Sequence, residues 1–383
     1  MKNLFVVFAV ALLTLSVIGL FDGCKGEEGP QGPPGPAGPD ASAFEGFAEG
    51  IKCGSCHDPD QDTTYYLWGR RYQWSQSKHA IGGDIERNGS GCAGCHTTEG
   101  FIQRMKSLTV TNQLTPSPPG CFACHSPHAR GNFTLRNVQP VSLLSNIVGV
   151  PNAQFDYGKG NLCAQCHQPR SMSPKMDANP SGDSLVITTT RWYAHYGLQS
   201  PTLMGEGGFK FPDFTYTGNS YHSGSSAIKQ EGCPTCHMAE QVYPPNTGTG
   251  KAGGHTMNIH YTWDGVEGQL LTGCKQSGCH PSMTSTDYPG ATTAPVGAQT
   301  ATLANLDTLM QLLGNKGYID TVSSSPNYGM VKLTGGKLVV KPAIKAGALY
   351  NFFFVEHDLS KGVHNTKYTI ELLRSSIGEI RKP

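Results

Sequence analysis

The sequence predicts a mostly irregular and α-helical fold with little β-structure, in which short helices carry a repeated Cys/His motif and longer helices lie near the C-terminus. Three observations support this prediction. The pentapeptide Cys-x-x-Cys-His recurs along the chain, glycine (48 residues) and proline (26 residues) are abundant, and helical periodicity is legible only beyond residue 290. Glycine and proline favour loops and turns. Only 37% of the residues are hydrophobic, so this loop-rich chain needs bulk from another source to fill its core.

Six motifs with two cysteines followed directly by a histidine lie between residues 53 and 280, and we number them one to six in chain order. Motifs one to five have two residues between the cysteines, and motif six has four. This pattern is the attachment signal for c-type haem, in which the thiols form thioethers and the histidine becomes the proximal iron ligand. The sequence therefore predicts a haem-filled core with six covalently attached c-type haems. The predicted attachment residues are Cys53, Cys56, Cys92, Cys95, Cys121, Cys124, Cys163, Cys166, Cys233, Cys236, Cys274 and Cys279, and the proximal ligands are His57, His96, His125, His167, His237 and His280.

Zinc knuckles and a disulfide framework are the two alternatives to haem. Paired Cys-x-x-Cys knuckles also bind zinc. A zinc site needs two knuckles, however, and gives no reason for the histidine that follows the second cysteine in all six motifs. Of the 13 cysteines, 12 lie in the motifs, which leaves only Cys24 for any other role. The cysteine count therefore argues against a disulfide framework.

The N-terminus predicts export. Lys2 and the apolar run of residues 4–21 have the n-region and h-region of a secretory signal. Gly23-Cys24 follows directly and resembles the cleavage box of bacterial lipoproteins, whose cysteine becomes lipidated and N-terminal, although Phe21 and Asp22 depart from the usual residues. An ordinary signal peptide and a single-pass membrane anchor are the alternatives. We expect an exported outer-membrane lipoprotein, held at the cell surface by a lipid on Cys24.

Residues 26–40 form five uninterrupted collagen-type Gly-x-y triplets. Glycine at every third position is what the crowded axis of a triple helix requires. Five triplets are few for an independently stable trimer, and the same segment would also be a stiff polyproline II spacer. We expect a spacer that lifts the following domain off the membrane, and a short trimerising stalk is the alternative.

Three helices and one strand are predicted near the C-terminus. Apolar residues recur at helical spacing in the stretch 300–315, and further helices are predicted over 342–355 and 367–377. Pro342 suits the first position of its helix. Residues 337–340 are a candidate short strand. We interpret the apolar stripes as packing surface and not as cofactor sites.

These features divide the chain into four parts. Residues 1–23 are the lipoprotein-type signal peptide, 24–44 the lipidated cysteine and spacer, 45–290 the hexahaem domain, and 291–383 a helical C-terminal part that packs on the haem domain. The net charge of +1 gives no basic footprint for nucleic acid.

Eight of the 14 histidines lie outside the motifs, which is enough to supply a second ligand to each of six irons. Several occur in distinctive contexts: Trp-x-x-Ser-x-His-Ala around His79, Cys-x-x-Cys-His-x-Pro-His at His128, Gly-Gly-His-Thr at His255 and Gly-Val-His-Asn at His364. With these motifs, residues 50–380 resemble the multihaem c-type cytochromes of metal-respiring bacteria, of the outer-surface hexahaem lipoprotein type. That group is distantly related to the nitrite reductase and hydroxylamine oxidoreductase cytochromes. The resemblance implies that the distal ligands are His79, His128, His195, His222, His255 and His364, with His260 and His357 as extras.

The chain departs from the nitrite reductases of that group in one respect. They carry a Cys-x-x-Cys-Lys haem with an open distal face for substrate, whereas all six motifs here end in histidine. An iron closed by two histidines passes electrons but binds no substrate. This favours an electron carrier over an enzyme.

Three functions follow from the sequence. We favour a hexahaem cytochrome that relays electrons along a chain of bis-His haems to extracellular acceptors such as metal oxides. Its partners would be other multihaem cytochromes or an outer-membrane electron conduit, and the membrane through the lipid. One alternative is a reductase of a small oxyanion or nitrogen compound with one open iron. The other is a subunit of a conducting cytochrome filament, in which the chain would form a homo-oligomer.

Overall fold

The computed structural model describes residues 66–126, 132–180, 182–217, 220–240, 250–276, 279–290 and 292–383. All of these belong to one compact unit that comprises Gly50–Pro383. The signal segment, Cys24, the Gly-x-y triplets, motif one (Cys53, Cys56 and His57) and His128 lie outside the described residues. The predictions made for them therefore stay predictions.

Short helices carry the described Cys-x-x-Cys-His motifs, as the sequence predicts. Motif two lies on α4 (Ser90–His96), motif three on α6 (Cys121–Cys124), motif four at α7 (Gly160–Ala164) and motif five on α11 (Pro234–His237). The remaining short helical elements are α3 (Leu67–Ser75), η2 (Lys78–Ile81), α5 (Thr98–Met105), α8 (Gln199–Met204), α9 (Tyr221–Gly224), α10 (Ser226–Glu231) and η3 (Gly254–Thr256).

The strands are short and pair only in twos within the described residues. β1 (Val141–Leu143) is antiparallel to β3 (Ala153–Phe155), and β2 (Ile147–Val148) is parallel to β4 (Met176–Asp177). β6 (His260–Trp263) and β7 (Val266–Gln269) form a hairpin. β5 (Leu185–Ile187) is antiparallel to β8 (Leu338–Val340), which is the strand predicted near residue 340. The expected fold class, mostly irregular and helical with little β-structure, is confirmed.

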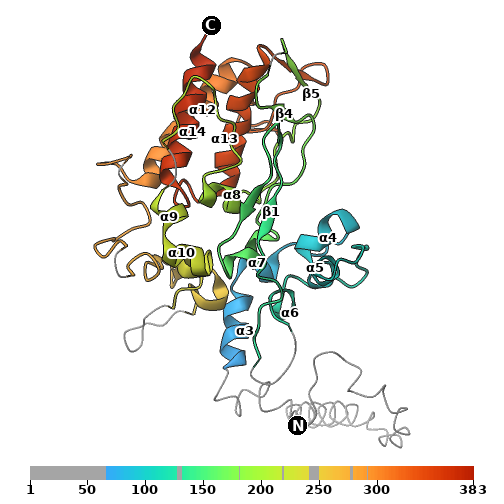
Figure 1. Ribbon diagram of the computed structural model, residues 1–383, viewed down its shortest axis with the longest axis vertical. Helices are drawn as coiled ribbons and strands as arrows, with labels where there is room; N and C mark the ends of the chain where they lie inside the picture. Colours follow the sequence, from blue (N-terminus) through green and yellow to red (C-terminus); the bar gives the residue numbers. More distant parts are fainter. Residues whose placement is uncertain are drawn as a thin grey trace, which may run out of the picture. The chain divides into compact units, whose positions relative to one another are not determined.

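The three predicted C-terminal helices are present and lie side by side (Figure 1). They are α12 (Ala298–Asn315), α13 (Ala346–Asp358) and α14 (Thr366–Arg381). Pro342 differs from its predicted role: its backbone is extended, and a 3₁₀ turn, η4 (Ala343–Lys345), begins one residue later and leads into α13. In the part of the chain that the structure describes, no helix is long and apolar enough to cross a membrane.

The largest hydrophobic core surrounds α13, whose residues are nearly all buried. On α12, Leu306, Leu309 and Leu313 face this core, whereas Leu303 is exposed. Segments far upstream also contribute, including the fully buried Trp192 and Phe209. This core therefore joins the C-terminal helices to the segment that precedes motif five. The helices of motifs two, three and four lie apart from it (Figure 1).

Candidate functional site

A single continuous cavity of about 2430 Å³ is lined by the residues of five motifs. All ten described motif cysteines and all five described motif histidines face it. Five of the predicted distal histidines face it as well: His79, His195, His222, His255 and His364. Pockets for one drug-sized molecule typically measure about 300–1,000 Å³, so this cavity has room for several large groups.

The histidines in the cavity meet in pairs, each formed by one motif histidine and one histidine from a distant segment. His96 of motif two faces His195, with ring centroids 6.1 Å apart, and His125 of motif three faces His255 at 6.2 Å. The other three pairs are His167 with His79 at 6.1 Å, His237 with His364 at 6.2 Å, and His280 with His222 at 6.1 Å. We refer to these pairs, with their motif cysteines, as sites two to six.

The spacing of the paired rings fits one metal ion held between them. A metal–imidazole bond is about 2 Å long, and the bound nitrogen is about 1.1 Å from its ring centroid, so two imidazoles on one ion have centroids about 6.2 Å apart. The five measured separations of 6.1–6.2 Å agree with this value. Among the described residues, no group of three or more His, Cys, Asp or Glu side chains is placed to hold a metal. Paired axial ligands, beside two thiols that face the same cavity, are the donor set of a c-type haem.

Hydrogen bonds at Nδ1 leave the other ring nitrogen free to bind a metal in five of these histidines. The acceptor is the Phe133 carbonyl for His125 (2.7 Å), the Met257 carbonyl for His237 (2.9 Å) and the Val363 carbonyl for His222 (2.9 Å). His167 bonds the Gln199 side-chain oxygen at 3.0 Å, and His364 bonds the Asp358 carboxylate at 2.7 Å. Such bonds fix the tautomer and the orientation of a ligating imidazole.

Burial keeps most of these imidazoles in the neutral form that binds metals. Burial lowers the pKa of His79, His195, His237 and His255 to about 4, and it also lowers the pKa of His96, His167 and His222. His364 differs. Burial acts to lower its pKa, but the neighbouring Asp358 carboxylate raises it by more.

Three of the histidines predicted as distal ligands lie on local structures with defined geometry. His79 lies in η2, whose first turn is capped by the Ser77 hydroxyl, which accepts a bond from the Ala80 N–H at 3.3 Å. His255 lies in η3, and its backbone N–H donates to the Gln73 side chain of α3 at 3.1 Å. His195 has a left-handed φ of 72°. These local structures fix the backbone from which each imidazole enters the cavity.

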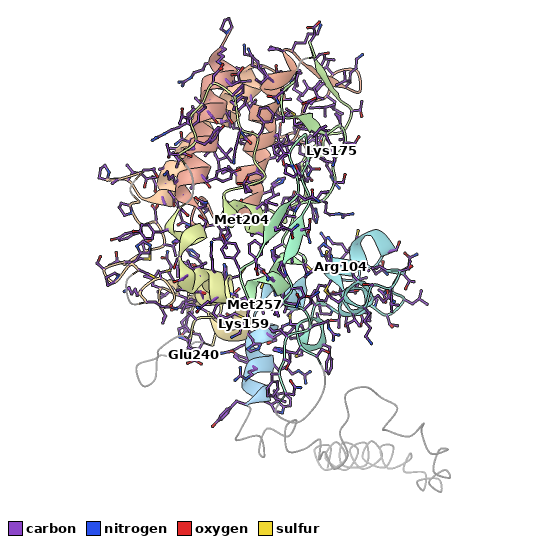
Figure 2. All side chains as sticks on the ribbon, in the orientation of Figure 1. Arg104, Lys159, Lys175, Met204, Glu240 and Met257 are labelled. Atoms are coloured by element: carbon purple, nitrogen blue, oxygen red, sulfur yellow. The ribbon has the colours of Figure 1, made fainter. Side chains whose placement is uncertain are left out.

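Neighbouring motifs approach one another closely. Arg104 of α5 bridges motifs two and four: Nη1 donates to Cys95 Sγ at 3.0 Å, and Nη2 donates to the Gln165 carbonyl at 2.5 Å. Figure 2 labels Arg104, which lies beside α4 and α5 of Figure 1. The thiol of Cys166 lies 3.9 Å from the Cys95 carbonyl oxygen. Sites two and four are therefore neighbours.

Two glycines bring motifs four and five together. A Cβ on Gly160, at the start of α7, would lie 2.9 Å from the Gly232 Cα and 3.5 Å from Cys233 Sγ. Gly232 has φ +63°, a left-handed value, and a Cβ there would lie 2.6 Å from the Tyr157 carbonyl oxygen. The two motifs are close enough that the Cys233 thiol, together with burial, raises the pKa of Cys163. Site four is therefore next to site five as well as site two.

The two histidines predicted as extras have different surroundings. His357 is buried outside the cavity, with Nε2 2.8 Å from the Glu356 carboxylate and its ring against Tyr193 and Tyr196. His260 lies at the edge of the cavity, with Nε2 3.2 Å from the Thr286 hydroxyl. Neither is paired with a described motif histidine.

Sequence reasoning missed the partners that orient the paired histidines. No sequence motif marks these partners, which lie outside the motifs that they contact. They are Gln199, Asp358 and Arg104. The carbonyls of Phe133, Met257 and Val363 have no sequence signal because any residue supplies a carbonyl. The way the ten histidines pair was likewise not predictable from their order in the chain.

Comparisons with known proteins give one similar structure. No family model matches the chain, and no curated protein matches it. Among solved structures, the outer cell wall cytochrome OcwA is similar, with a TM-score of 0.46 and 20% sequence identity. The likeness covers 82% of this chain and 50% of the OcwA chain, so this chain spans about half the length of the protein that it matches.

Proposed function

We propose that this chain is a hexahaem c-type cytochrome that relays electrons. The observation that carries the proposal is the cavity that brings together five pairs of histidines and the two thiols of each of five motifs. The rings of each histidine pair are spaced to hold one iron between them. The motif cysteines would attach the haems, and each motif histidine with its partner would supply the two axial ligands. When bound, haem supplies one-electron exchange at an iron closed on both faces.

The neighbourhoods of the motifs support a route through the protein. Site four contacts sites two and five, and site six approaches site five, because His222 bonds the backbone at Val363, next to His364. Cys121 of motif three and Cys279 of motif six are exposed, and Phe122 beside Cys121 is 50% exposed. We propose that electrons enter and leave near these two solvent-facing motifs, which a redox partner can approach directly.

The N-terminal sequence supports the location. We propose that the export signal, the lipid on Cys24 and the Gly-x-y spacer hold the haem domain at the outer membrane, facing extracellular acceptors or other cytochromes. A reductase with one open iron is the second candidate. It requires that motif one, whose residues lie outside the described part, has no distal histidine.

Electron paramagnetic resonance of the oxidised full-length protein, with and without nitrite or cyanide, tests the proposal. A pyridine haemochrome assay on the same sample counts the haems. Six haems, all low-spin and indifferent to both anions, are expected for a relay. A high-spin signal that shifts with ligand would favour the reductase. A preparation with zinc and no covalent haem would refute both functions.

A further inference from the structure

Residues 358–364, which run from the last residue of α13 into the loop before α14, contact the paired histidines of three sites. This segment carries His364 of site five, and its Val363 carbonyl accepts the hydrogen bond from His222 of site six. Gln199 connects it to site four, because Gln199 Nε2 donates to the Asp358 carbonyl at 3.1 Å while Oε1 bonds His167 Nδ1 at 3.0 Å.

The loop has an unusual backbone conformation. Leu359, Lys361 and Gly362 have φ values of 63°, 54° and 88°, so three of its residues are in the left-handed region. A Cβ on Gly362 would lie 2.3 Å from the Thr302 hydroxyl of α12. A side chain at this position would therefore push the loop off its support.

Asp358 is the charged partner of His364. Its side chain is only 2% exposed, and Oδ1 lies 2.7 Å from His364 Nδ1. The Ser360 hydroxyl donates to the second carboxylate oxygen, and the same hydroxyl accepts from the His364 N–H at 3.3 Å. The Nδ1 acceptors found for His125, His167, His222 and His237 are neutral carbonyl or amide oxygens. Among these described hydrogen bonds, site five alone has a carboxylate.

We propose that Asp358 makes site five the most negative in reduction potential of sites two to six, an inference that rests on the proposed haem ligation. A carboxylate that accepts the Nδ1–H bond makes the imidazole a stronger electron donor to its metal. The buried negative charge also favours the ferric over the ferrous state, since charge interactions are strong away from water. Asp358 is thus a positioning residue that acts through His364. It places a low-potential step between sites four and six.

The test is a spectroelectrochemical titration of the full-length holoprotein, wild type against Asp358→Asn. Asparagine keeps the size of the side chain and an oxygen acceptor but removes the charge. Site one is outside the comparison, so site five is expected to give one of the two most negative one-electron steps. We expect that step to become at least tenfold easier to reduce, which is about 59 mV for one electron, with the other steps unchanged. One low-spin EPR signal should change its g-values.

Ser360→Ala is the complementary variant, since it deletes a neutral donor to the carboxylate and leaves the charge more available to His364. The same step should then move in the negative direction. Glu356→Gln is the matched control, because this carboxylate lies two residues from Asp358 but contacts His357, which is in no described pair. It should leave all steps in place.

The outcomes separate this inference from the proposed function. If wild type carries six low-spin haems but Asp358→Asn leaves both of the two most negative steps unmoved, the role of Asp358 is refuted and the relay stands. An equal shift in Glu356→Gln would also refute it, because charge in general and not the bond to His364 would then be responsible. Loss of low-spin haem in the wild type would refute both. If Asp358→Asn does not accumulate with full haem, the sign of the shift in Ser360→Ala decides.

Discussion

On the proposed ligation, removing His222 should open one iron and no other. His222 faces His280 at a centroid separation of 6.1 Å, and its Nδ1 is held by the Val363 carbonyl at 2.9 Å. In His222→Gly, site six keeps both thiols and His280 but loses the second axial ligand. The oxidised protein should show a high-spin signal from one iron of the six that the motifs predict, while the remaining irons stay low-spin.

Free imidazole should close the opened site, because the deleted side chain leaves a space of matching size and chemistry. A tethered ligand acts at an effective concentration of about millimolar or more, so we expect rescue to need imidazole on the order of that concentration. The assay is EPR with an imidazole titration followed in the visible spectrum. His357→Gln is the control, since His357 is buried outside the cavity and should leave every iron low-spin. A fully low-spin His222→Gly protein with six haems would refute the pairing of His222 with His280.

Three further predictions concern the framework around the sites. Gly232→Ala should destabilise the fold by about 1–3 kcal/mol, because alanine is strained at φ +63° and would clash with the Tyr157 carbonyl. Denaturant unfolding measures this loss, and an unchanged unfolding midpoint would show that the contact is dispensable. Leu349→Ala in α13 should cost about 2–5 kcal/mol, since the side chain is fully buried; calorimetry should show a lower Tm with the haem count unchanged. Asp287 accepts bonds from the Gln299 and Thr300 N–H groups at the start of α12, so Asp287→Ala should cost about 1 kcal/mol at neutral pH. Partial burial acts to raise the pKa of Asp287, but the bonds from Thr300 and Gln299 lower it below the ordinary 3.8. Wild type therefore keeps this stabilisation above pH 3.8 and loses it as the pH falls through the lower folded-state pKa of Asp287. A difference in the free energy of unfolding between wild type and Asp287→Ala that widens toward acid pH would contradict this reasoning.

Local sequence was a good guide to the elements and to the motif residues that line the cavity. Motifs two to five lie at short helices because the pattern itself requires two thiols and a histidine within about one turn. The helix around Leu306 and Leu309 was predictable from spacing, because apolar residues at three- and four-residue intervals form one face.

The second ligand of each site was not predictable in the same way. His79 pairs with His167 of motif four and not with His96, which is nearer in sequence. Local sequence does not predict this pairing, because η2 and motif four meet only through tertiary folding. The strand that pairs with β8 was not predictable for the same reason, since β5 lies far upstream in the sequence. Asp358 has no local signal either, and its effect depends on burial that a one-dimensional pattern does not contain.

The wide separation of paired histidines along the chain has a consequence for biosynthesis. Joining residues that are distant in sequence requires large loops to close, which is slow and entropically costly. On the proposed export route, His237 would be translocated well before His364, so site five would spend part of its assembly with only one of its two histidines in place. Site five would be complete only once the segment that carries His364 has docked beside motif five.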